Sequence, residues 1–197
     1  MEITFAWIAV VAIGITSAGR IFVRDWRWSI ILLAVQYAGM FVLVLQHWPI
    51  GMATVKVVAG WMSAAILGMT RSGLAIEVEE SIVPQGRLFR LFAAATVVLI
   101  TAVITPTVDT IMADAGFPVT NGGLLLIGMG LLHLGITTYV LRVVIGLMTV
   151  LSGFEILYAT VEGSVLVAAL LAAINLGLAL VGAYLLIASH PQEPESL

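Results

Sequence analysis

The sequence predicts an all-α polytopic membrane protein with about seven transmembrane helices. Its 197 residues are 61% hydrophobic and 10% charged, whereas about 25% of the residues of a soluble domain are charged. The long apolar stretches match the roughly 20 residues that a helix needs to cross a hydrocarbon core, and the short alternating strands of a transmembrane barrel are missing. Basic residues collect at the ends of these stretches. The predicted spans are residues 3–19, 28–46, 50–70, 88–105, 122–141, 143–161 and 164–188.

The first span, residues 3–19, is interpreted as a retained helix and not as a signal peptide. Glu2 precedes it, and its arginines follow the apolar run, which is the reverse of a signal peptide's charge order. The second and third spans are separated by a very short turn that contains Pro49. These two helices are therefore expected to form a hairpin.

The fourth span, residues 88–105, is expected to connect two halves of the chain. Before it lies a polar segment, residues 71–87, with the helix breakers Gly and Pro. After it, residues 109–123 contain Pro118 and several small polar residues, which predict a long outer loop.

The last three spans follow one another closely. The sixth and seventh are separated by only Glu162 and Gly163, so they are expected to form a second hairpin. Two three-helix units on either side of the fourth helix are therefore a possible architecture. The predicted organisation is an N-terminal unit (1–73), a cytoplasmic loop, fourth helix and outer loop (74–121), a C-terminal unit (122–189) and a cytoplasmic tail (190–197).

The positions of the basic residues predict the orientation. All arginines lie at or near span ends on one side: Arg20, Arg24, Arg27, Arg71, Arg87, Arg90 and Arg142. The opposite loops carry only acidic charges: Glu2, Asp109, Asp114 and Glu162. Basic loops face the cytoplasm, so the N-terminus is expected outside and the C-terminus inside a bacterial or archaeal cell membrane. Trp26, Trp28 and Trp48 are at positions typical of interfacial aromatic residues.

Lys56 and Glu155 are the charged residues placed deep inside predicted spans. At 1.5 Å per residue, each lies about 9–10 Å below the outer boundary, on hairpins that could face each other. A lysine inside a membrane costs roughly 2.5–3.5 kcal/mol on insertion scales, so it usually has a partner. A proton or ion relay and a purely structural ion pair are both consistent with this arrangement.

Three uncharged polar residues are expected close to the mid-plane, about 15 Å from the outer boundary: Gln36, His133 and Asn175. With Lys56 and Glu155 they predict one polar layer that forms an ion pathway. Haem is not expected, because no second histidine has a matching depth, and the absence of cysteine excludes thiolate metal sites. Motifs for hydrolysis, nucleotide binding or nucleic-acid binding are also missing. No cofactor is predicted, and an enzyme activity of the chain alone is not expected.

Residues 132–147, with the Leu-Gly-Ile-Thr motif and the basic Arg142 before Val-Ile-Gly-Leu, resemble a known family. The C-terminal unit is similar to the K-type subunit of complex I and to the C-type subunit of Mrp antiporters. Over most of its length the chain is similar to the E component of hydrogenase-4-type complexes, in which an Ala-x-Gln pattern like that ending at Gln36 and an intramembrane lysine like Lys56 occur. The resemblance implies a membrane-arm subunit that takes part in proton transfer.

The chain departs from that family at two carboxylates. Met148 stands where the K-type second helix has a glutamate, and Ala173 stands near the position of the other. Glu155 is two helical turns beyond Met148 on the same face, so it is a candidate substitute.

The predicted function is a non-catalytic subunit of a proton- or sodium-translocating complex, with antiporter-like membrane subunits and lipid as partners and no nucleic acid. Such a complex would be respiratory, hydrogenase-like or antiporter-like, a group that includes ion-translocating oxidoreductases. Two alternatives remain open. In the first, the chain is a small autonomous ion-coupled transporter, which inverted repeats and broken helices would favour. In the second, it is a purely structural assembly subunit.

Overall fold

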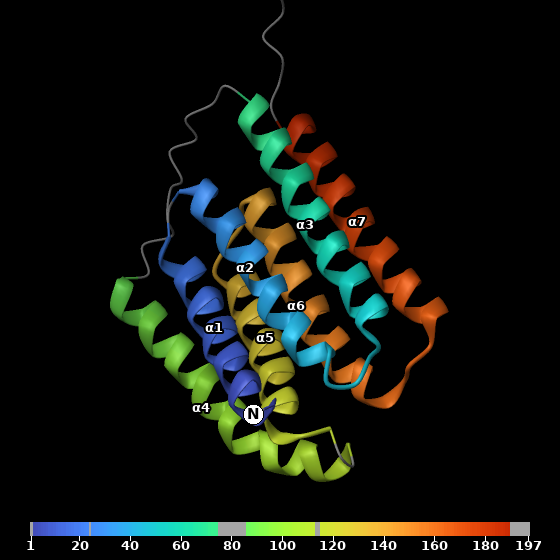
Figure 1. Cartoon of the computed structure of the whole chain (residues 1–197). Coiled ribbons are helices and arrows are strands. Elements are labelled where there is room, and N and C mark those ends of the chain that lie inside the picture. Colours follow the sequence, from blue (N-terminus) through green and yellow to red (C-terminus); the bar gives the residue numbers. More distant parts are fainter. Residues whose placement is uncertain (1, 24, 75–85, 113–114, 190–197) are drawn as a thin grey trace, which may run out of the picture.

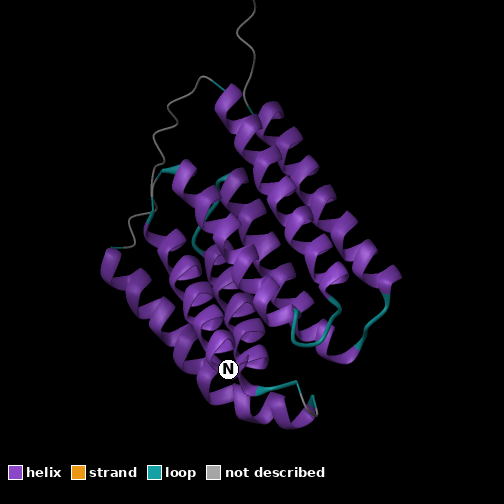
Figure 2. Ribbon diagram, in the orientation of Figure 1, coloured by secondary structure: helices purple, strands orange, loops and turns teal. Residues whose placement is uncertain are grey.

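The computed structural model describes the chain except residues 1, 24, 75–85, 113–114 and 190–197. The described part contains seven α-helices and no strand, and each helix is long and apolar enough to cross a membrane (Figures 1 and 2). The predicted all-α polytopic fold is therefore confirmed. The helices are α1 (Glu2–Phe22), α2 (Trp26–Val44), α3 (Ile50–Gly73), α4 (Arg87–Ile111), α5 (Phe117–Gly135), α6 (Val140–Val161) and α7 (Val165–Ala188).

Local sequence signals explain several helix starts. Asp25 is the N-cap of α2, and its Oδ1 accepts a hydrogen bond of 2.9 Å from the backbone N–H of Arg27. Pro49 directly precedes α3, whose first turn does not need the missing N–H. Gly116 precedes α5 with φ +84°, a conformation that glycine adopts without strain, and Pro118 lies in the first turn.

The connection between α4 and α5 is much shorter than predicted. The expected loop 109–123 was wrong, because α4 continues to Ile111 and α5 already begins at Phe117. The polar residues that suggested a loop pair across the two helices instead. Thr120 donates from Oγ1 to Asp109 Oδ1 at 2.8 Å, and Asn121 donates from Nδ2 to Thr105 Oγ1 at 3.1 Å. Figure 1 also shows α4 changing direction in its C-terminal part, where Pro106 lacks a backbone donor.

The boundary between the fifth and sixth helices also differs from the prediction. The fifth span was expected to reach residue 141, but α5 ends at Gly135, and α6 begins at Val140. Gly135, Thr137 and Thr138 are weak helix formers, which accounts for this break within an apolar run. Arg142 consequently lies in the first turn of α6.

The helices of the two predicted three-helix units pack against each other in pairs. α1 lies against α5, α2 contacts α6, and α3 packs chiefly against α7. The members of each pair run in the same direction (Figure 1). α4 lies outside this arrangement, mainly against α5, and exposes apolar residues such as Leu88, Phe92 and Val103.

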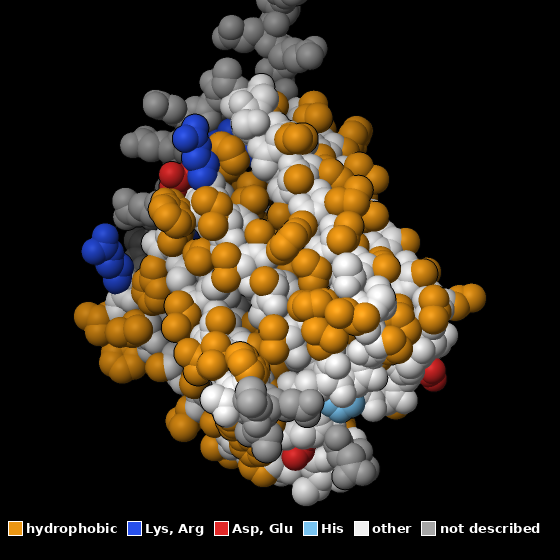
Figure 3. Space-filling view, viewed as in Figure 1, with side chains coloured by type: hydrophobic (Ala, Val, Ile, Leu, Met, Phe, Trp, Pro, Cys, Tyr) orange, Lys and Arg blue, Asp and Glu red, His pale blue; other side chains and the backbone are white. Residues whose placement is uncertain are grey.

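The surface has the distribution expected for a protein surrounded by lipid. On the face in Figure 3, apolar side chains cover the middle, and basic side chains gather at one end. Trp28 is exposed, as predicted for an interfacial aromatic residue. Trp48 is buried instead, and its Nε1 donates to the backbone oxygen of Glu162 at 2.8 Å. This bond ties the α2–α3 turn to the α6–α7 turn.

Candidate functional site: a buried polar network

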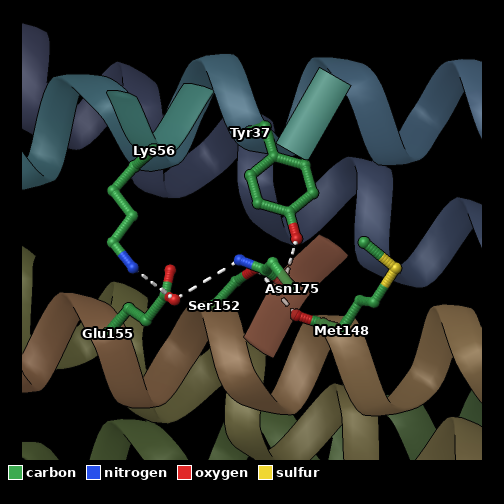
Figure 4. A network of polar contacts seen from close by, with 6 residues as sticks. All are labelled: Tyr37, Lys56, Met148, Ser152, Glu155 and Asn175. Atoms are coloured by element: carbon green, nitrogen blue, oxygen red, sulfur yellow. Dashed lines mark hydrogen bonds and ion pairs between the residues drawn. The ribbon is translucent and has the colours of Figure 1, made fainter. Parts of the chain in front are cut away.

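Lys56 and Glu155 form an ion pair inside the helix bundle. Lys56 lies in the second turn of α3, and its Nζ is 2.7 Å from Glu155 Oε1 on α6 (Figure 4). The two residues are only 1% and 0% exposed. Their similar depth followed from the sequence, and the structure adds that their side chains meet directly.

Asn175 and Tyr37 extend the contact to two further helices. Asn175 on α7 donates from Nδ2 to Glu155 Oε1 at 3.3 Å, and Tyr37 on α2 donates its hydroxyl to Asn175 Oδ1 at 3.0 Å. Both residues are fully buried. Side chains from α2, α3, α6 and α7 thus form one continuous network, which Figure 4 shows from close by.

The buried face of α6 supports this network. Met148, Ser152 and Glu155 are buried at helical spacing on one side of the helix, as predicted for Met148 and Glu155. The Ser152 hydroxyl donates to the Met148 backbone oxygen at 2.8 Å, so it is satisfied within its own helix. Ala173, by contrast, lies on the exposed side of α7, two residues from Asn175. At the depth of the polar network, α7 therefore directs Asn175 inward.

Gln36 belongs to a second polar cluster rather than bonding to Lys56 or Glu155. It accepts hydrogen bonds at Oε1 from Arg20 Nη2 and, at 3.4 Å, from the hydroxyl of Ser17, both on α1. Gln36 directly precedes Tyr37 in α2, and both side chains are buried. The two clusters are thus neighbours within the bundle interior.

His133 lies closer to the end of its helix than the predicted span placed it. It lies in the last turn of α5, because that helix ends at Gly135 and not near residue 141. The ring is buried and lies 3.4 Å from the position that a Cβ at Gly146 would take. Its Nε2 has no hydrogen-bond partner among the described residues.

Two participants were missed by the sequence reasoning. Arg20 was interpreted as a cytoplasmic flanking residue, although the apolar residues 21–23 that follow it place it before the end of the helix. Tyr37 was not considered, although a tyrosine in mid-span needs a hydrogen-bond partner for its hydroxyl. Extending the first apolar run past Arg20 gives the first signal, and the position of Tyr37 in the middle of the second run gives the other.

Other features of the described residues lie apart from this network. No group of three or more His, Cys, Asp and Glu within the described ranges is placed to hold a metal ion. A cavity of about 530 Å³ is lined by residues that include Phe5, Gln46 and His47, near the ends of α1 and α2 that carry no arginine. None of the five predicted pathway residues lines it.

Comparison with known proteins gives no match: no family model matches the sequence, and neither a curated protein nor a solved structure matches it.

Proposed function

We propose that the chain is a non-catalytic membrane-arm subunit of a multisubunit complex that translocates protons or sodium ions. Its contribution is part of a polar ion pathway through the middle of the membrane. Lys56 and Glu155 carry the charge in this pathway, and Asn175 and Tyr37 connect them to the interior of α2. Gln36 and Arg20 extend the polar residues toward the arginine-bearing end.

The observation that carries the proposal is the buried Lys56–Glu155 pair with its connection to Asn175 and Tyr37. Charged groups inside a membrane are costly and mark ion or proton pathways in membrane proteins. A carboxylate beside an ammonium can exchange a proton with it, and protonation of one changes the proton affinity of the other. Hydrogen bonds to Asn175 and Tyr37 give that charge change a route to neighbouring helices.

The helix arrangement supports a subunit more than an autonomous transporter. None of the seven described helices is interrupted near its middle, and corresponding helices of the two units run parallel. Transporters with inverted repeats place broken helices at a mid-membrane site. The resemblance to hydrogenase-4-type and K-type subunits, which rests on short motifs, points to the same function.

A structural subunit is the second candidate, and the direct 2.7 Å contact of Lys56 and Glu155 favours it. An ion pair that is fully satisfied can fix α3 against α6 without conducting anything. Met148 in place of the K-type glutamate also agrees with a structural role. The experiment must therefore separate transport from assembly.

The first measurement is native mass spectrometry of the tagged protein, extracted from its own cells in mild detergent. Co-purification with large antiporter-like subunits is expected. Lys56→Met and Glu155→Gln are then compared with Val58→Met, which changes an exposed residue of α3. Proton or sodium uptake into membrane vesicles is expected to fall about tenfold or more in the first two variants, because the relay loses a charge.

Three other results would contradict the proposal in different ways. Unchanged uptake with an intact complex would assign the ion pair to structure. Loss of the complex in both variants, with normal uptake per assembled complex, would do the same. A stable monomer or homo-oligomer without partner subunits would exclude the membrane-arm role.

A further inference from the structure

The bundle interior near the arginine-bearing end contains a buried guanidinium. Arg20 lies in the last turn of α1 and is 3% exposed. Helical side chains lean toward the N-terminus of their helix, which directs Arg20 away from the near end of α1 and into the bundle. An arginine stays protonated in proteins, so this charge needs a counterpart.

The hydrogen-bonding groups around Arg20 are mostly donors without acceptors. Nη2 donates to Gln36 Oε1. Arg20 Nε and Nη1 are buried and have no partner among the described residues, and the same is true of Gln36 Nε2. A buried donor without an acceptor costs about 1–3 kcal/mol, and more when the group is charged.

The charges of the neighbouring residues increase this imbalance. Arg142 in the first turn of α6 lies at the same end of the bundle as Arg20 in the last turn of α1. Arg142 donates to the Val23 backbone oxygen at 2.9 Å, so it also reaches the end of α1. Among the carboxylates whose side chains the structure describes, Glu155 is bonded to Lys56, Asp109 accepts from Thr120, and Asp25 and Glu162 are exposed.

We propose that Arg20 and Gln36 form a binding site for a small monovalent anion of chloride size. Arg20 Nη1 and Gln36 Nε2, which both lack an acceptor among the described residues, would donate to it, and its charge would balance the buried guanidinium. A monovalent anion fits better than a neutral acceptor, because hydrogen bonds between ionised groups are about twice as strong as neutral ones. The site is separate from the Lys56–Glu155 pair and does not depend on the proposed function.

The test uses the full chain in nanodiscs of uncharged lipid. Its Tm is measured in sodium bromide, sodium chloride and sodium gluconate at equal ionic strength. A ligand that binds only the folded state raises Tm, so a shift of about 4 °C is expected at a halide concentration ten times the Kd. Line broadening of the bromide NMR signal measures binding directly.

Three variants identify the site. Gln36→Glu places a carboxylate beside Arg20, so it is expected to abolish the halide shift while raising Tm in gluconate. Arg20→Met removes the charge and should abolish the shift and the line broadening. Arg27→Gln is the matched control, because Arg27 is exposed at the same end of the bundle and stacks on Trp26. It should retain the full halide response.

The proposal is wrong if the wild-type Tm is the same in halide and gluconate. It is also wrong if Gln36→Glu keeps the wild-type halide shift, since that variant carries its own counter-charge. A loss of the response in Arg27→Gln equal to that in Arg20→Met would assign the halide effect to surface screening. If Arg20→Met does not fold, Gln36→Glu and Arg27→Gln still decide the question.

Discussion

Lys56 and Glu155 stabilise each other in a place where neither charge is tolerable alone. Their side chains are almost completely buried, and the surrounding residues of α2 and α7 supply Tyr37 and Asn175 as hydrogen-bonding neighbours. Removing one member of a buried pair leaves an uncompensated charge, whereas removing both leaves only a gap in packing. The energetic effects of the two substitutions are therefore expected to be strongly coupled.

A double-mutant cycle measures this coupling. Lys56→Met alone and Glu155→Gln alone are each expected to lower the free energy of unfolding in bicelles, Lys56→Met by about 3–5 kcal/mol. The double variant should be more stable than the sum of the two losses predicts. Additive losses would mean that the two side chains do not interact in the membrane.

The Tyr37 hydroxyl gives a second residue-scale prediction. Tyr37→Phe removes the donor to Asn175 Oδ1 and leaves the ring in place, so a loss of about 0.5–1.5 kcal/mol in unfolding free energy is expected. Tyr184→Phe is the control, since Tyr184 is 69% exposed and should tolerate the change. Equal effects of the two substitutions would contradict the buried hydrogen bond.

At the scale of the helices, α5 and α6 pack unusually close together. Glycines recur at helical spacing on the facing sides of α5 and α6, and a Cβ built on Gly153 would lie 2.5 Å from the backbone oxygen of Gly123. A backbone atom cannot move aside as a flexible side chain can. Small residues at this interface therefore fix the distance between the two helices, as is common where helices pack in lipid.

Gly153→Ala is expected to separate α6 from α5 and to lower the Tm by several degrees, because a loss of about 1–3 kcal/mol follows from overpacking. Gly177→Ala in α7 is the matched control. A Cβ there meets nothing within 4 Å, so only the higher helix propensity of alanine acts, and Tm should stay the same or rise. A Gly153→Ala protein as stable as the wild type would contradict the close contact.

The seven helices were predictable because each apolar run is long enough to cross a membrane, but their ends were not. Thr120 and Asn121 have the polarity of loop residues, and only the facing helix α4 shows that their side chains are satisfied inside a helix pair. At Gly135 the error was the opposite one. The predicted span continued to residue 141 because the sequence there is largely apolar, whereas α5 ends at Gly135. Hydropathy registers polarity and length, whereas helix ends depend on hydrogen-bond partners from other elements.

At the scale of the whole molecule, the sequence brought Lys56, Glu155 and Asn175 to similar depths but did not show which side chains make contact. The rise per residue put Lys56, Glu155 and Asn175 within about 6 Å of one another along the membrane normal. Which of them touch depends on how α3, α6 and α7 are arranged laterally. That arrangement also separates Gln36 from the ion pair and gives it Arg20 as a partner.

The orientation of the molecule is testable because the chain contains no cysteine. Ser72→Cys introduces an exposed thiol at the arginine-bearing end, and Gly163→Cys introduces one at the opposite end. Arginines favour the cytoplasmic side, so a membrane-impermeant maleimide should label only Gly163→Cys in intact cells. Both variants should react after permeabilisation, and labelling of Ser72→Cys alone in intact cells would reverse the predicted topology.

The separation of Lys56 and Glu155 in the chain has a consequence for biogenesis. A ribosome that has just added Lys56 must add 99 more residues before the partner carboxylate is complete. During that interval the lysine enters the bilayer without its counter-ion, and the apolar remainder of α3 must offset an insertion cost of about 2.5–3.5 kcal/mol. The arrival of α6 ends this exposure, so the ion pair closes the bundle late in synthesis, and chains truncated before α6 are predicted substrates for membrane quality control.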